Sequence, residues 1–526
     1  MPMKKALLAA VALSLASPAA ALAEDKVSIT VNIVQLVGKI DPAVIGSYTE
    51  YMAAVNFYDG LTTVAPSGEI IPQLAESWSV SEDNLTYTFN LKKGATFQNG
   101  DPVKASDVVY SLNRLVAINK GPSYLFSGLI AEDGVKALDD HTVSITLNKV
   151  YAPFLSNTPL ILVVNEAQAK ANATAEDEWA ELYVGQNPIG AGPYSLSSWN
   201  RGSEMIMARN VNYHEGWSAD KKPIDEVRFV ITRDEATVRA LATRGELAFS
   251  SQYQANETYD AIGKMKGYDV LELDTASNLY IKLNHQKAPT DDVHVRRALA
   301  YALDYSTVRE LIFPSSDLNG PLAASFADAY NFDLPAVEFN LEKAEEELKK
   351  SKYYGNGPIK LDHVYADDTP VSEEIGLLSK AILDSIGFEV DLRPEPWTRM
   401  TELAANPETT PNATQIYQGP SYPSPDAVFF VSYHSKAAGT WASTSWVNDP
   451  KVDGLIEKAR GQTNPDEQNA TYKELQAYLV DQQSDIYVGT QKRQHARSVC
   501  LQGFEYIPMQ SWDHDFSRLW WDCSAK

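Results

Sequence analysis

Long apolar runs are missing from most of this 526-residue sequence. Beyond residue 23 the best apolar segment, residues 159–164, is six residues long, and we interpret it as a buried strand. A membrane-spanning helix needs about 18 or more consecutive apolar residues. The sequence therefore predicts no membrane span after residue 23.

Positive charge is also scarce. The chain has 45 Lys and Arg against 69 Asp and Glu, which gives a formal net charge of -24 at pH 7. Such a chain repels nucleic-acid phosphates and anionic membrane surfaces. Nucleic-acid binding is therefore excluded as the main function.

Motifs that carry enzyme chemistry are absent as well. The sequence has no Gly-x-x-x-x-Gly-Lys phosphate loop, no His-Glu-x-x-His metal motif and no Gly-x-Ser-x-Gly nucleophile elbow. Pro193 directly follows Gly190-Ala191-Gly192 and lacks the amide that a phosphate would need, so we interpret these glycines as a turn. Adjacent carboxylates such as Asp139 and Asp140 diverge, which does not suit acid–base catalysis. We expect no enzyme activity, no cofactor and no metal.

The first residues have the pattern of an export signal. Lys4 and Lys5 precede an almost unbroken apolar run over residues 6–16, and Ala21-Leu22-Ala23 resembles a cleavage site. We expect residues 1–23 to be a signal peptide that is cleaved after Ala23. The mature protein is then expected in the periplasm.

Export makes the scarcity of cysteine informative. Cys500 and Cys523 are the only two cysteines, and both lie near the C-terminus. Disulfides persist in oxidising compartments. The even number and the compartment predict a disulfide bond between them rather than two free thiols.

What the sequence does have is an ordinary globular composition, with 44% apolar and 22% charged residues. A chain of this length usually divides into two or more domains. Alternating and helical periodicities are interleaved along it, which predicts a mixed α/β fold. Strands are predicted over residues 27–37, 85–91 and 142–147. Helices are predicted over residues 106–115 with Ser106 as cap, from Asp292, over 341–350, and from Val452 after Asp449-Pro450.

Aromatic side chains are abundant, with 10 Trp, 27 Tyr and 16 Phe. A cleft for a polar solute combines flat apolar faces with converging hydrogen-bond donors and acceptors. Aromatic residues gather with small polar residues at 48–51, 397–422, 441–446 and 512–514. From these clusters and the loop after the second one we predict the ligand-binding residues Tyr48, Glu50, Trp397, Gln418, Gly419, Ser421, Tyr422, Ser424, Trp441 and Trp512.

Three ordered blocks of motifs extend along nearly the whole mature chain. The first contains Tyr58-Asp59-Gly60-Leu61, Pro72-Gln73-Leu74-Ala75-Glu76-Ser77-Trp78 and Phe97-Gln98-Asn99-Gly100-Asp101-Pro102, the second covers residues 187–194, and the third covers 284–304. With these blocks the sequence resembles the periplasmic solute-binding proteins of peptide-type ABC importers, solute-binding protein family 5. This family includes dipeptide, oligopeptide, nickel and opine receptors.

The resemblance implies an α/β, two-lobed periplasmic-binding-protein fold of class II, of the large cluster C type, with an extra subdomain in the first lobe. We expect lobe I over residues 24–283 with the subdomain at roughly 60–185, lobe II over 284–488, and a return to lobe I over 489–526. Hinge closure would enclose the ligand between the lobes. The implied partners of this monomer are a small-molecule ligand and the permease and ATPase of an inner-membrane ABC importer.

The ligand class depends on one loop. Peptide-binding members of the family carry an Asp for the ligand's α-amino group, five residues before the end of a short Asp/Pro-rich stretch. Here that stretch is residues 419–426, and the matching position is Ser421. A neutral hydroxyl does not supply the charge-assisted bond that an ammonium group needs. A shifted alignment would instead assign the role to Asp426.

The string Gly-Pro-Ser-Tyr-Pro-Ser-Pro at residues 419–425 resembles that of receptors for agrocinopine-type opines, which are sugar phosphodiesters. This resemblance implies that Gln418, Gly419, Ser421 and Ser424 hold the sugar-phosphate end while nearby aromatics stack on rings. The preferred ligand is therefore an opine-like sugar phosphodiester or another sugar-containing compound. Di- or oligopeptides are the alternative. A secreted glycoside hydrolase, which needs two carboxylates about 5–10 Å apart, is a third possibility.

Overall fold

The computed structural model describes residues 26–36, 38–509 and 511–524. The expected signal peptide and its cleavage site lie outside the described residues. Among the described residues, no helix has both the length and the apolar character needed to cross a membrane.

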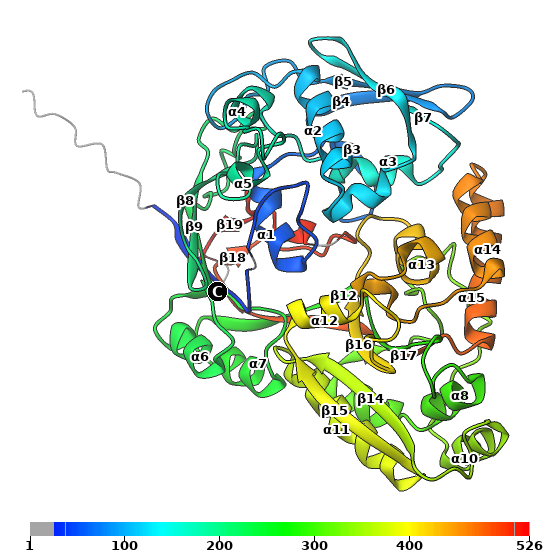
Figure 1. Ribbon diagram of the computed structural model, residues 1–526. Helices are drawn as coiled ribbons and strands as arrows, with labels where there is room; N and C mark the ends of the chain where they lie inside the picture. Colours follow the sequence, from blue (N-terminus) through cyan, green and yellow to red (C-terminus); the bar gives the residue numbers. More distant parts are fainter. Residues whose placement is uncertain (1–25, 37, 510, 525–526) are drawn as a thin grey trace, which may run out of the picture.

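One sheet of 11 strands runs through both lobes (Figure 1). Its lobe I strands are β8 (Tyr194–Asn200), β9 (Glu204–Arg209), β10 (Glu226–Ile231), β1 (Ser28–Ile33) and β11 (Leu247–Phe249). Its lobe II strands are β16 (Ala413–Gln418), β14 (Ile359–Ala366) and β15 (Phe388–Glu395). Between the two groups lie β12 (Tyr268–Leu283), β17 (Asp485–Ser498) and the short β13 (Ser315–Ser316). The expected two-lobed α/β architecture is confirmed.

The long strands β12 and β17 carry the chain between the lobes. Residues 268–274 of β12 pair with 492–498 of β17, next to lobe I. Residues 278–282 of β12 pair with β17, and residues 278–283 pair with β16, in lobe II. The pairing is interrupted between Asp274 and Asn278, which separates the part of the ladder beside lobe I from the part beside β16. The lobe boundaries inferred from the sequence at 283/284 and 488/489 stay predictions.

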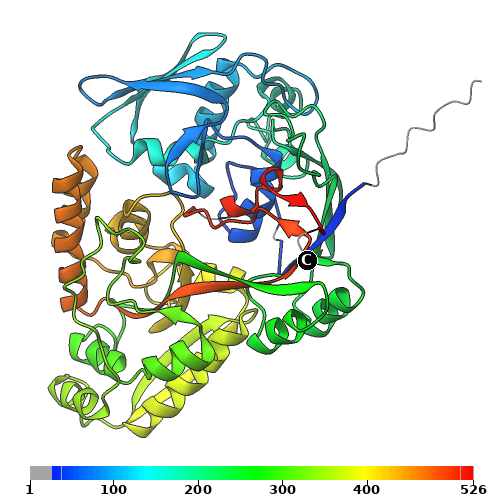
Figure 2. The ribbon, with the colours of Figure 1, turned by 180° about the vertical axis from the view of Figure 1, so that it is seen from behind.

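A separate four-stranded antiparallel sheet lies beside lobe I (Figure 2). It consists of β4 (Ala75–Val80), β5 (Thr86–Leu91), β7 (Thr142–Leu147) and β6 (Ile130–Asp139), and α2 (Ala105–Ile118) contacts it. Two predicted strands and one predicted helix are thereby confirmed. The predicted cap of α2 is wrong, because the Asp107 carboxylate, not the Ser106 hydroxyl, accepts the backbone N–H of Lys104 at 2.8 Å.

The remaining helices surround the main sheet. Lobe I holds α1 (Tyr48–Phe57), α4 (Glu166–Ala171), α5 (Glu181–Val184), α6 (Glu235–Thr243) and α7 (Asn256–Gly263). Lobe II holds α8 (Val293–Tyr301), α9 (Tyr305–Thr307), α10 (Leu341–Lys350), α11 (Pro370–Ser385), α12 (Trp397–Leu403), α13 (Asp426–Tyr433), α14 (Pro450–Gly461) and α15 (Pro465–Asp481). As predicted, Asp292 caps α8 and Asp449 precedes α14.

The predicted strand over residues 159–164 is wrong. The chain forms a 3-10 turn over Thr158–Leu160, and beyond it only Leu162 makes an isolated bridge, to Gly60. Pro159 lacks an N–H and suits the first turn of a helix better than a ladder. The segment is nevertheless buried, as its apolar composition required.

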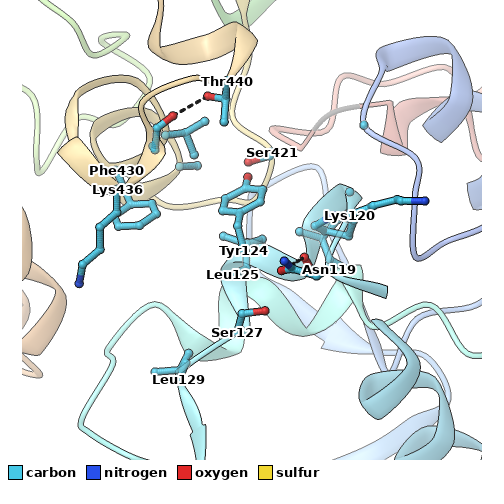
Figure 3. A pocket seen from close by; sticks show the side chains of 18 of the residues that line it. Asn119, Lys120, Tyr124, Leu125, Ser127, Leu129, Ser421, Phe430, Lys436 and Thr440 are labelled. Atoms are coloured by element: carbon cyan, nitrogen blue, oxygen red, sulfur yellow. Dashed lines mark hydrogen bonds between the residues drawn. The ribbon is translucent and has the colours of Figure 1, made fainter. Parts of the chain in front are cut away.

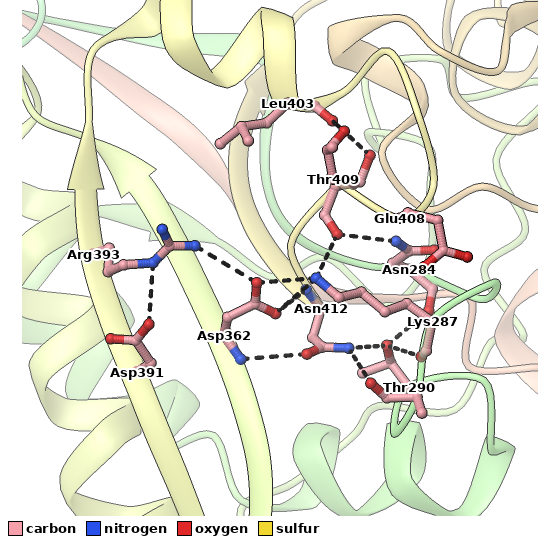
Figure 4. A network of polar contacts seen from close by, with 12 residues as sticks. Asn284, Lys287, Thr290, Asp362, Asp391, Arg393, Leu403, Glu408, Thr409 and Asn412 are labelled. Carbon is pink, nitrogen blue, oxygen red and sulfur yellow. Dashed lines mark hydrogen bonds and ion pairs between the residues drawn. The ribbon is translucent and has the colours of Figure 1, made fainter.

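A polar network fixes the loop after β12 to the edge of lobe II (Figure 4). The Lys287 ammonium lies 3.1 Å from the Asp362 carboxylate and donates to the Thr410 carbonyl at 3.0 Å. Asp362 also accepts the backbone N–H of Asn412 at 2.7 Å. Asn412 immediately precedes β16, so the network holds the start of the strand that leads into the loop at 419–425.

The C-terminal segment returns to lobe I and is closed by the predicted disulfide between Cys500 and Cys523. Within this loop β18 (Leu501–Gln502) pairs with β19 (Trp520–Trp521). Gly503 has a φ of +86° and approaches the Trp520 ring so closely that a Cβ would lie 2.2 Å from it. A glycine is required there for both reasons.

A buried ion pair joins β12 to β17 in lobe II. The Lys282 ammonium lies 3.1 Å from the Asp485 carboxylate, and neither side chain is accessible to solvent. Asp485 also accepts hydrogen bonds from the Tyr433 hydroxyl at 2.7 Å and the Ser445 hydroxyl at 2.5 Å. Burial lowers the pKa of Lys282, and the Asp485 charge opposes that shift.

Replacing Asp485 is expected to destabilise the protein strongly. Asp485→Ala leaves the Lys282 charge buried without a partner and removes the acceptor of two hydroxyls, so the free energy of unfolding should fall by about 3–5 kcal/mol. Asp269→Ala is the matched control. It removes an ion pair with Arg497 on the same two strands, but the Asp269 side chain is 42% exposed, so its partner stays hydrated when the pair is lost. That change should cost about 0–1 kcal/mol. Equal losses in denaturant titrations of the two variants would contradict this assignment.

Candidate functional site

A cavity of about 650 Å³ lies between the two lobes (Figure 3). One wall comes from lobe I and its subdomain, mainly residues 44–46 before α1 and 119–129 after α2. The facing wall comes from lobe II, namely residues 418–421 and side chains of α13, α14 and the segment 436–441. A volume of this size suits a small-molecule ligand.

Four of the predicted ligand-binding residues line this cavity: Gln418, Gly419, Ser421 and Trp441. Gln418 ends β16, and Pro420 directly after Gly419 cannot donate to a strand ladder. The chain therefore leaves the sheet at the cavity edge and turns through 419–425 into α13. The three prolines of this loop restrict its backbone, which holds Ser421 in place.

Ser421 has an unusual position in this wall. Its hydroxyl oxygen is buried and makes no hydrogen bond of ordinary geometry among the described residues, although the Tyr124 hydroxyl lies close enough to interact with it. In Figure 3 the hydroxyl of Tyr124, from the opposite wall, points toward it. A buried polar atom without a well-formed hydrogen bond costs free energy, which a ligand group that reaches this hydroxyl would recover.

Two predicted residues lie directly behind the cavity wall. Trp397 packs edge-on against the lining residue Trp441, with ring centroids 5.4 Å apart. Trp512 packs against the lining residue Tyr51, at 5.7 Å between centroids. Both tryptophans therefore support an aromatic ring that faces the cavity, and their own contact with a ligand stays a prediction.

Two further predicted residues make contacts within lobe I. The Tyr48 hydroxyl lies 3.5 Å from a ring nitrogen of His514. The Glu50 carboxylate accepts the backbone N–H groups of Gly46 and Ser47 at 3.0 and 3.1 Å, which caps its own helix α1. Neither residue lines the cavity, and their role in ligand binding stays a prediction.

Tyr422 and Ser424 are part of a buried network around Asp426. The Asp426 carboxylate accepts hydrogen bonds from the Tyr422 and Tyr151 hydroxyls, both at 2.8 Å, and lies 3.4 Å from the Arg460 guanidinium. The Ser424 hydroxyl accepts the backbone N–H of Asp426 at 3.3 Å. Asp426 is inaccessible to solvent and is absent from the cavity lining. Both tyrosine hydroxyls donate to Oδ2, whereas Oδ1 makes no hydrogen bond and lies 3.4 Å from the Arg460 guanidinium. Because Asp426 is buried behind the wall and paired with a cation, it is poorly placed to bind a ligand ammonium.

This network bridges the lobes, because Tyr151 comes from the segment between β7 and α3 (Phe154–Asn157) whereas Asp426 begins α13. Two more contacts accompany it. The backbone N–H of Ala152 donates to the Arg460 carbonyl at 2.9 Å, and the Lys149 ammonium lies 2.7 Å from the Glu457 carboxylate. Including the Tyr151–Asp426 hydrogen bond, three contacts therefore join the subdomain of lobe I to lobe II.

The local charge of the cavity differs from that of the whole chain. Its described lining has four basic residues, Lys120, Lys149, Lys436 and Arg460, and one acidic residue, Glu457. Three of the cations already have carboxylate partners, and Lys436 has none among the described residues. Figure 3 shows the Lys120 and Lys436 chains pointing away from Tyr124 and Ser421. The centre of the cavity is therefore uncharged and its rim is basic.

Sequence reasoning missed the wall formed by residues 119–129 and the side chain of Phe430. The sequence signal for the first is a loop with Gly121-Pro122, Tyr124 and Gly128 directly after a predicted helix. Phe430 lies in an apolar helix that is otherwise buried in lobe II, and nothing in its sequence distinguishes it from a core residue.

Two lobes joined by two long strands, with a cavity between them that both lobes line, define a solute-binding protein that closes around its ligand. Residues 69–440 match the family described as bacterial extracellular solute-binding proteins, family 5, and the chain belongs to this family. It is accordingly the solute-binding component of an ABC importer.

Known relatives cover nearly the whole chain. It is 26% identical over 482 residues to the probable D,D-dipeptide-binding periplasmic protein of Escherichia coli, covering 89% of this chain and 90% of that protein. A periplasmic binding protein of Helicobacter pylori in complex with the peptide STSA superposes with a TM-score of 0.84 at 21% identity, over 94% and 98% of the two chains. The binding protein AgaA from A. tumefaciens R10, solved with agropinic acid, gives a TM-score of 0.81 at 22% identity, over 94% and 99%.

Removing the Tyr151 hydroxyl is expected to favour the open arrangement of the lobes. Tyr151→Phe deprives the buried Asp426 of one of its two hydroxyl donors only when the lobes are closed, so the closed-to-open ratio should fall at least about fivefold. Spin labels on cysteines introduced at the exposed residues Glu82 and Glu474 would report the lobe separation by double electron–electron resonance.

The matched control for this measurement is Tyr433→Phe. It deletes a comparable buried hydroxyl–Asp bond, but one that lies wholly within lobe II. Tyr433→Phe should lower stability and leave the distance distribution of the labelled protein unchanged. Identical distributions for Tyr151→Phe and the unsubstituted protein would contradict a role of Tyr151 in closure.

Proposed function

We propose that the protein captures, in the periplasm, a polar solute without a free ammonium group, preferably an opine-like sugar phosphodiester or another sugar-containing compound. It encloses this solute between its lobes and delivers it to the permease and ATPase of an ABC importer. In this role it is a monomeric transport receptor and not an enzyme.

The observation that carries the proposal is Ser421. Its hydroxyl is buried at the cavity without a well-formed hydrogen bond among the described residues, at the position where the family's peptide receptors are expected to have a carboxylate. A hydroxyl both donates and accepts, which suits the hydroxyls and ester oxygens of a sugar phosphodiester. Asp426, the nearest alternative carboxylate in the loop sequence, is held by Tyr151, Tyr422 and Arg460.

The charge of the cavity supports the same ligand class. Lys436 is the one lining cation without a carboxylate partner among the described residues, so the lining carries a small positive excess that favours an anion or a neutral group over an ammonium group. This local excess acts at short range, whereas the distant negative charges of the chain are screened beyond about 8–10 Å. A phosphodiester is therefore compatible with the cleft despite the net charge of -24.

A di- or oligopeptide is the second candidate, since the relatives named above include a probable dipeptide receptor and a peptide complex. Glu457 is the one acidic residue in the described lining, and it already binds Lys149. A peptide ammonium would have to displace that lysine. A glycoside hydrolase is less well supported, because its two carboxylates would both have to face the cavity.

Ser421→Asp distinguishes the first two candidates. The new carboxylate would repel a phosphodiester and leave an unmatched acceptor in the closed cleft, so affinity should fall tenfold or more, about 1.4 kcal/mol. The same change would supply the anchor that a peptide ammonium lacks, and peptide affinity should rise. Titration calorimetry with a sugar phosphodiester and a tripeptide measures both effects.

Ser127→Asp serves as the control, because Ser127 also lines the cavity but is exposed, so its carboxylate stays hydrated. Its effect on either ligand should be within about threefold. Tight tripeptide binding by the unsubstituted protein, with no response to the phosphodiester, would refute the proposed ligand class and leave the transport role intact.

A further inference from the structure

Two hydroxyls face each other across the cavity, one from each wall. Ser421 makes no well-formed hydrogen bond among the described residues, and the Tyr124 hydroxyl faces it (Figure 3). Most other polar groups of the wall are already occupied. The Thr440 hydroxyl donates to the Ala437 carbonyl at 2.9 Å, and Lys120 lies 2.9 Å from Glu181.

Most of the wall below these two hydroxyls is apolar, apart from the exposed Ser127. Leu125, Leu129 and Phe430 are each less than 10% exposed and surround the space below Ser421 in Figure 3. The buried residues Ile45 and Leu160 and the half-buried Val431 complete this apolar compartment. Water in such a compartment finds few hydrogen-bond partners, so an apolar group displaces it favourably.

The compartment is also rigid. The Arg460 guanidinium lies 3.9 Å from the centroid of the Phe430 ring and 3.4 Å from the Asp426 carboxylate. Phe430 is therefore fixed by a cation–π contact and by the buried network behind it. A wall that is fixed before the ligand arrives loses little entropy on binding.

We propose that the natural ligand is amphiphilic: it carries an apolar group of several carbon atoms that fills the compartment between Leu125, Leu129 and Phe430, while its polar end meets Ser421. This inference deepens the proposed function and rests on it for the polar end. A compact, fully hydroxylated sugar would leave the apolar wall in contact with water, so burial of that wall would contribute nothing to the affinity.

The test is a series of n-alkyl β-D-glucosides with one, four, six and eight carbons, titrated calorimetrically below their micellar concentrations. Each methylene that enters the compartment should raise the affinity about three- to fourfold until the compartment is full. A series of trialanine, trivaline and trileucine is titrated in parallel. These peptides offer apolar groups with an ammonium head.

The two series separate failure of this inference from failure of the proposed function. Chain-length dependence in the peptides alone supports the apolar compartment and contradicts the polar end proposed for Ser421. Dependence in the glucosides supports both. Affinity that does not change with apolar size in either series overturns the inference, whatever head group binds.

A pair of isosteric variants locates the effect. Val431→Thr places a hydroxyl in the compartment without changing its shape, and the octyl glucoside should bind three- to tenfold more weakly while the methyl glucoside is unaffected. Val428→Thr is the control, because Val428 lies on the same helix but is packed in the core of lobe II. It should leave the dependence on chain length unchanged. Equal effects of the two variants would count against the compartment.

Discussion

The antiparallel pairing of β12 with β17 is the constraint on which the rest of the molecule depends. Each strand is a core strand of lobe I at one end and of lobe II at the other. The ladder is interrupted between Asp274 and Asn278, and there the Thr275 hydroxyl donates to the Gln491 carbonyl at 2.8 Å. Hinge movement of one lobe against the other is expected to act on such a segment. On either side of this segment the two strands must be held firmly within their lobe. In lobe II the buried ion pair between Lys282 and Asp485 holds β12 to β17.

Like Lys282 and Asp485, several other buried ion pairs join separate segments of this acidic protein. Arg114 with Asp41, Arg493 with Asp513, and Arg460 with Asp426 are all pairs with little or no exposed side-chain surface. A buried pair adds little net stability, but it is costly to break, so it specifies which segments lie together. The third pair differs from the other two, because the Asp426 carboxylate also accepts a hydrogen bond from the Tyr151 hydroxyl of the opposite lobe. An acid that an alignment could assign to the ligand is thus used for closure.

Local sequence signals predicted the elements that depend on local physics. Alternation gave β5 and β7, helical periodicity gave α2 and α10, and an even number of cysteines gave the disulfide. The two wrong predictions, the cap of α2 and the strand over residues 159–164, concern residues that could form more than one local structure. Ser106 was the better cap by local preference, but α2 begins at Ala105, which places Ser106 inside the helix and lets Asp107 accept the N–H of Lys104. The same carboxylate accepts the N–H of Glu166, 59 residues away. Pro159 likewise allowed a buried turn where apolar composition alone indicated a strand.

The sequence by itself determined the family, the two-lobed α/β class and the loop that presents Ser421, because these are encoded in contiguous motifs. Only the tertiary structure decided which side chains face the cavity. It brought Tyr124 opposite Ser421 and placed Leu129 and Phe430 on facing walls of one cavity, pairs that no sequence pattern connects. It also assigned Glu50 to a helix cap and Trp512 to the support of Tyr51. The physical reason is that a hydrogen-bonding or aromatic side chain satisfies whichever partner the fold brings near, and in a cleft between lobes those partners come from distant parts of the chain.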